Sequence, residues 1–168
     1  MTDRFDSRRQ TVVTLTTYWS CILLGLAIPG LSTVAVDMLK HGQSLGQALH
    51  QWHIHLFAPG FNLFLVALLN ALPFVLFAVF VLFHLGLADR RSPGWLRRLS
   101  GVVLATLVAI GLSLWTHVMT LWHPDAQGAL AYFMLPMLLL LVIPACYVLG
   151  WAGCFAWQQL RSADSLAQ

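Results

Sequence analysis

The sequence has very little charge. Only 9% of its 168 residues are charged, whereas 59% are hydrophobic, and the mean hydropathy is +0.77. A soluble domain carries about 25% charged residues, so this chain could not cover its surface with polar groups in water. The composition excludes a soluble globular domain and predicts one all-α integral membrane protein domain over residues 1–168.

Several signatures of chemistry are also missing. The sequence contains no glutamate, no CxxC pair, no phosphate-binding loop, no nucleotide fingerprint and no hydrolase elbow. Cys21, Cys146 and Cys154 lie inside apolar stretches, which favours small buried packing residues over a disulfide or a redox pair. The net charge of +3 comes from arginines beside apolar stretches, which indicates contact with lipid headgroups rather than with nucleic acid.

Four apolar stretches are long enough to cross a bilayer, which needs about 20 residues. We expect these spans at residues 12–36, 61–87, 99–121 and 129–157. No charged residue lies at the middle of a span, which argues against a proton-coupled carrier. Pro29 is expected to kink or end the first span. Asn70 is expected to help satisfy the carbonyl that Pro73 frees near residue 69.

A short amphipathic helix is predicted between the first two spans, at residues 44–57. Its apolar residues recur on one helical face: Leu45, Leu49, Trp52 and Leu56. The longest polar connection of the chain surrounds this segment. We therefore expect the helix to lie on the outer surface of the membrane.

The arginines predict the orientation. Those that flank the spans fall in the N-terminal tail, in the connection at residues 89–98 and in the C-terminal tail: Arg4, Arg8, Arg9, Arg90, Arg91, Arg97, Arg98 and Arg161. The opposite side carries only Lys40. Positive residues stay on the cytoplasmic side, so both termini and this connection are expected there, in a bacterial inner membrane.

Small residues recur every four positions in the last two spans. One stripe is Gly101, Ala105 and Ala109, and the other is Cys146, Gly150 and Cys154. Such stripes let another helix approach closely. They favour a non-catalytic accessory or assembly subunit that packs against partner membrane proteins or against a second copy of itself. An enzyme is disfavoured, and no cofactor is indicated.

Six of the seven histidines fall at or beyond the outer ends of the spans. The alternative hypothesis is therefore a transport or redox protein with an outer site for a divalent metal or small ligand, made by His53, His55, His117 and His123. Three further alternatives stay open. They are a haem between His55 and His117, a Ser113–His117 pair oriented by Asp125, and an oligomeric channel lined by hydroxyls of the first span.

Overall fold

The computed structural model describes residues 2–59, 62–86, 94–124 and 128–166, and every regular element within these ranges is a helix. The helices are α1 (Thr2–Lys40), α2 (Leu45–His55), α3 (Leu63–Gly86), α4 (Gly94–Trp122) and α5 (Gly128–Leu166). Four of them are long and apolar enough to cross a bilayer. The predicted all-α membrane protein with a short helix after the first span is confirmed.

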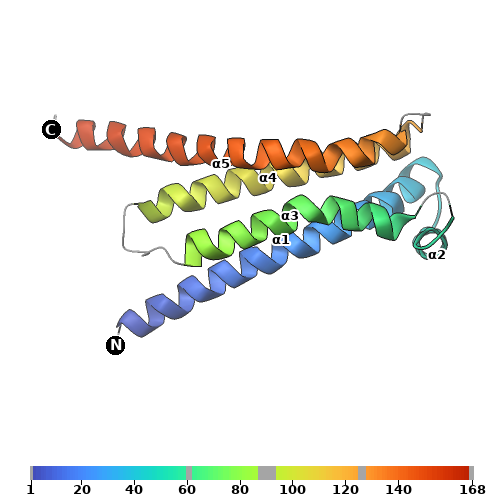
Figure 1. The fold of residues 1–168 in the computed structure, drawn as a ribbon, viewed down its shortest axis with the longest axis horizontal. Coiled ribbons are helices and arrows are strands. Elements are labelled where there is room, and N and C mark those ends of the chain that lie inside the picture. Colours follow the sequence, from blue (N-terminus) through green and yellow to red (C-terminus); the bar gives the residue numbers. More distant parts are fainter. Residues whose placement is uncertain (1, 60–61, 87–93, 125–127, 167–168) are drawn as a thin grey trace.

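The four long helices run side by side along the molecule (Figure 1). α1 packs mainly against α3, and α4 mainly against α5; contacts of α1 with α4 and of α3 with α5 join the two pairs. Both termini lie at one end of the bundle and α2 lies at the other (Figure 1). We call these ends the inner end and the outer end.

Two helices continue well past the predicted spans. α1 and α5 have 39 residues each and are therefore about 58 Å long, against about 30 Å for the hydrocarbon core. The expectation that Pro29 would kink or end the first span is wrong as far as the end is concerned, because α1 continues to Lys40. Hydropathy identifies the apolar residues that cross the bilayer. The helical hydrogen bonds continue through the polar residues on either side of that apolar stretch, so the helix is longer than the span.

The connection between α1 and α2 is fixed by turn and cap residues. Gly42 has φ of 64°, and the amide of Gln43 donates to the carbonyl of Asp37 at 3.2 Å. Ser44 then caps α2, because its hydroxyl accepts from the amide of Gln47 while the Gln47 side chain accepts from the amide of Ser44. These local bonds set the start of α2 without help from the bundle.

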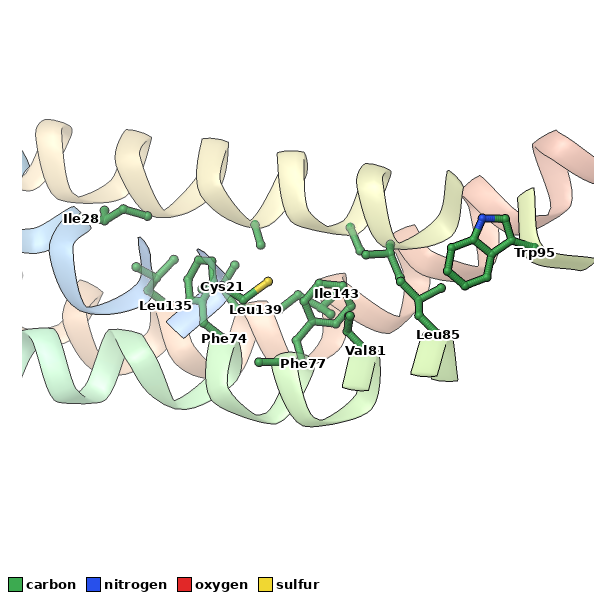
Figure 2. Packing of buried hydrophobic residues seen from close by; sticks show 14 residues of the cluster. Cys21, Ile28, Phe74, Phe77, Val81, Leu85, Trp95, Leu135, Leu139 and Ile143 are labelled. Atoms are coloured by element: carbon green, nitrogen blue, oxygen red, sulfur yellow. The ribbon is translucent and has the colours of Figure 1, made fainter. Parts of the chain in front are cut away.

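A continuous apolar core runs through the bundle. Its side chains follow one another along the helix axes, from Ile28 and Leu135 to Leu85 and Trp95 (Figure 2). α2 is attached to this bundle through Trp52, whose indole lies against Gly30 of α1. A Cβ atom at Gly30 would lie 2.7 Å from the indole nitrogen, so a larger residue there would have to displace the indole. Trp52 therefore holds the amphipathic helix at the outer end.

Some predicted features lie outside the described residues. These are Arg90 and Arg91 of the connection between α3 and α4, and Asp125 of the connection between α4 and α5.

Candidate functional site

A buried chain of polar groups joins three helices. The Asn70 side-chain amide on α3 donates to the Gly25 carbonyl on α1 at 2.7 Å. The Ser113 hydroxyl on α4 donates to the Asn70 side-chain oxygen, also at 2.7 Å. Both polar side chains are almost fully buried. Their geometry fixes the relative position of α1, α3 and α4.

Pro29 explains why the Gly25 carbonyl needs this donor. In an α-helix that carbonyl would accept from the amide of residue 29, and proline has no amide hydrogen. A carbonyl without a partner in the membrane interior costs several kcal/mol, by order of magnitude. Asn70 thus satisfies the carbonyl that Pro29 leaves free in the neighbouring helix α1. From the sequence, it was instead expected to satisfy the carbonyl that Pro73 frees in its own helix.

His117 lies one turn beyond Ser113 and is only 1% exposed. Its Nδ1 is 2.8 Å from the Ser113 carbonyl, which can only accept, so Nδ1 carries the proton. Nε2 is then a bare lone pair, and no hydrogen-bond partner for it occurs among the described residues. The Tyr132 ring of α5 lies against the imidazole, with centroids 5.4 Å apart. His117 is a structural group of the bundle with one unused acceptor.

The Ser113–His117 pair does not form a nucleophile with its base. The imidazole contacts the carbonyl of Ser113, whereas the hydroxyl proton of Ser113 goes to Asn70. A base must accept that hydroxyl proton to activate the oxygen. The described geometry therefore gives no support to hydrolytic chemistry here.

The four histidines of the predicted metal site lie in different surroundings. His53 and His123 are exposed, His55 is half-buried on α2, and His117 is enclosed by the helices. Within the described ranges, no group of three or more His, Cys, Asp or Glu residues could hold a metal ion. The enclosed imidazole of His117 also offers no open face for a haem shared with His55. The geometry supports neither site.

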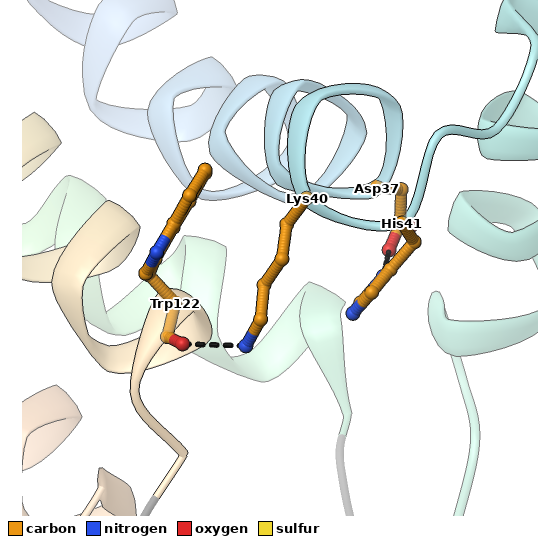
Figure 3. A network of polar contacts seen from close by, with 4 residues as sticks. All are labelled: Asp37, Lys40, His41 and Trp122. Carbon is orange, nitrogen blue, oxygen red and sulfur yellow. Dashed lines mark hydrogen bonds and ion pairs between the residues drawn. The ribbon is translucent and has the colours of Figure 1, made fainter.

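A polar network closes the outer end between α1 and α4 (Figure 3). The Lys40 ammonium group at the end of α1 donates to the carbonyl of Trp122, the last residue of α4. A cation at a helix C-terminus satisfies a free carbonyl and interacts favourably with the helix dipole. Beside it, His41 and Asp37 approach to 3.1 Å. The Lys40 bond therefore ties the end of α1 to the end of α4.

The two predicted small-residue stripes meet inside the chain. A Cβ atom at Gly101 would lie 2.7 Å from the Tyr147 carbonyl oxygen, and one at Gly150 would lie 2.7 Å from the Ser100 carbonyl oxygen. Ala105 and Ala109 are also fully buried, whereas Cys146 and Cys154 are half-buried. Gly101 and Gly150 bring α4 and α5 together, and Ala105 and Ala109 are buried inside the chain, so these stripes no longer argue for an external partner.

A groove between α3 and α5 was not expected from sequence. Its volume is about 370 Å³, and its lining is apolar except for His84 and Tyr147. The Tyr147 hydroxyl and His84 Nε2 share a hydrogen bond, and the Phe80 ring stacks on the imidazole at 4.8 Å. Two polar aromatic residues inside apolar spans were the available signal, but the register that pairs them is not visible in the sequence.

Comparison with known protein families, with curated proteins and with solved structures finds no match to this chain.

Proposed function

We propose that this chain is a non-catalytic accessory or assembly subunit of a membrane complex. The observation that carries the proposal is a small-residue face of α5 that the bundle leaves uncovered. Ala145, Ala152, Gly153 and Ala156 are all exposed. A Cβ atom at Gly153 would meet nothing within 4 Å. Small residues on an open helical face permit the close approach of another membrane helix.

This exposed face of α5 continues past the inner end of α3. Tyr147 lies level with His84, near the inner end of α3, because the two side chains are hydrogen-bonded. From Tyr147 to Leu160, α5 rises about 20 Å farther. Leu160, on this part of α5, is 66% exposed. A partner helix packed along α5 would cover both the small residues and this apolar side chain.

Substitution on the small-residue face tests the proposal. We expect wild-type protein extracted in mild detergent to migrate as a complex, either with another chain or with a second copy. Ala152→Leu and Ala156→Leu should release the single chain without changing its free energy of unfolding, because neither side chain packs inside the bundle. Ala129→Leu serves as the matched control, since Ala129 is also exposed on α5 but lies on a different face of the helix from Ala152 and Ala156. A wild-type chain that migrates alone would overturn the proposal.

The groove between α3 and α5 favours a second candidate function, the binding of a small lipophilic molecule with a polar head. Ligand sites measure about 300 to 1,000 Å³, are mostly apolar and place a few polar groups for orientation. The groove has this composition, and the His84–Tyr147 pair always keeps one donor, whichever of the two donates in their shared bond. A bilayer-soluble carbonyl compound of the quinone class fits these groups.

A short-chain benzoquinone is a direct probe of this second candidate. It should raise the melting temperature of the wild-type protein in detergent, because a ligand that binds only the folded state stabilises it. Tyr147→Phe and His84→Leu should abolish that rise. His53→Leu should keep the rise in melting temperature, because His53 is exposed on α2 and does not line the groove. Equal shifts in all four proteins would identify a nonspecific effect of the quinone on the micelle.

The remaining hypotheses receive less support from the described geometry. A metal at the outer face would require several histidines to converge, and those of the described residues form no such group. A channel lined by the first span would require its hydroxyls to share one face. Thr14 is buried, Thr17 donates to its own helix at Val13, and Thr16 and Ser20 are exposed.

The proposed orientation places the inner end in the cytosol, as the arginine distribution predicts.

A further inference from the structure

A second hollow lies between α4 and α5 at the inner end. Its volume is about 700 Å³, larger than that of the groove between α3 and α5, and it carries more polar surface. It lies on the inner side of the close contact at Gly101 and Gly150, where Figure 1 shows the two helices moving apart. Leu99 and Val103 form part of its apolar wall, and Val103 is 48% exposed.

Two arginines border this hollow and each is held in place by its neighbours. The Nε of Arg97 donates to the Gln158 side-chain oxygen at 2.6 Å, and its guanidinium carbon lies 4.4 Å from the centroid of the Phe155 ring. The guanidinium carbon of Arg161 lies 5.1 Å from the Trp157 ring centroid. Aromatic faces orient guanidinium groups without neutralising their charge. Both positive charges therefore remain available to an anion.

Among the residues that the structure describes, none that lines the hollow is acidic, and the side chains of Gln158 and Ser162 add polar groups beside the arginines. The bond from Arg97 to Gln158 uses Nε, which leaves the two terminal nitrogen groups of the guanidinium for a further acceptor. The site thus combines a positive polar rim with an apolar wall.

We propose that this hollow binds the headgroup of an anionic phospholipid, with the acyl chains against Leu99 and Val103. Basic pockets between membrane helices bind such headgroups, and each arginine near the surface contributes to the attraction. Charge complementarity selects the anionic lipid, and the continuous apolar wall selects a lipid over a soluble anion. The occupant fills the space that α4 and α5 leave beyond their glycine contact.

Native mass spectrometry of the full chain in neutral detergent tests this proposal. We expect phosphatidylglycerol to remain bound where phosphatidylcholine with the same acyl chains is lost. Arg97→Gln and Arg161→Gln should each reduce phosphatidylglycerol retention by about fivefold and leave phosphatidylcholine unaffected. Arg161 is exposed, so its variant keeps the test valid even where Arg97→Gln folds poorly.

Arg98→Gln is the matched control. It removes one positive charge from the same turn of α4, but its guanidinium donates to the His84 carbonyl and does not border the hollow. This variant should retain phosphatidylglycerol like the wild type. Equal loss in Arg98→Gln, or equal retention of both lipids by the wild type, would overturn the proposal. Displacement of the lipid by an equal concentration of inorganic phosphate would also overturn it, in favour of a soluble anion.

Discussion

Asn70 joins the first three spans through two buried hydrogen bonds. It accepts from Ser113 and donates to the carbonyl that Pro29 frees in α1. The sequence indicated that a proline inside a span needs a compensating donor. It did not show which helix supplies that donor, because the pairing depends on the register between α1 and α3. Local rules thus predicted the need, and only tertiary packing reveals the partner.

Asn70→Ala should lower the free energy of unfolding by about 1–3 kcal/mol, since it leaves two buried polar groups without partners. Replacing Pro29 with alanine as well should recover about 0.5–1.5 kcal/mol of that loss, because residue 29 regains an amide for the Gly25 carbonyl. Denaturation in mixed micelles gives the free energy of unfolding of the wild type, the two single variants and the double variant, which together form a double-mutant cycle. Strictly additive effects would contradict the repair of α1 by Asn70.

His117 leads to a prediction of opposite sign. His117→Leu loses the Nδ1 bond to the Ser113 carbonyl, but it also removes Nε2, which has no partner among the described residues, and it keeps the apolar contact with Tyr132. The free energy of unfolding should stay within about 1 kcal/mol of the wild type or rise. The same micelle titration checks this. A loss of several kcal/mol would mean that Nε2 binds a group such as a water molecule in the membrane.

The pairing of α4 with α5 belongs to the scale of whole elements. The small-residue period predicted a close helix contact, and the structure places one at Gly101 and Gly150 within the chain. Periodicity identifies the face of a helix but not what covers it. For the same reason the open face around Ala152 and Gly153 could not be distinguished from a buried one by sequence alone.

Gly101→Ala and Gly150→Ala should each destabilise the α4–α5 pair by about 1–3 kcal/mol, because the new methyl group would meet a backbone oxygen that cannot move freely. Gly111→Ala is the control on the same helix. A Cβ atom there meets nothing within 4 Å, and alanine favours the helix, so stability should be unchanged or slightly higher. Equal behaviour of the three variants would exclude a special contact at the crossing.

At the scale of the whole molecule, hydropathy was sufficient for the four spans and the amphipathic pattern for α2. The outer histidines were a weaker guide, because their positions in the sequence give their depth but not their direction. His117 is buried in the bundle, whereas His53 is exposed on α2 and His123 is exposed just after the end of α4. Convergence of ligands depends on tertiary packing, which no spacing in this sequence specifies.

The orientation of the molecule is a prediction that labelling can check. In a variant without the native cysteines, Gly46→Cys on exposed α2 should react with a membrane-impermeant maleimide in intact cells. A tag at either terminus should become accessible only after permeabilisation, since arginine-rich ends of membrane helices are generally retained in the cytosol. Labelling of the termini in intact cells would reverse the proposed topology and place the arginine-bordered hollow in the opposite leaflet.

The bond between Asn70 and Gly25 has a consequence for biogenesis. Ribosomes deliver α1 before α3, so the carbonyl that Pro29 exposes has no donor until the second span arrives. We expect α1 alone to be retained poorly in the bilayer and the α1–α3 hairpin to be retained well. Asn70→Ala should return the hairpin to the behaviour of the solitary helix. Nascent chains of increasing length can be assayed for release from the translocon. This assay would show the chain length at which the α1–α3 hairpin forms and stays in the bilayer.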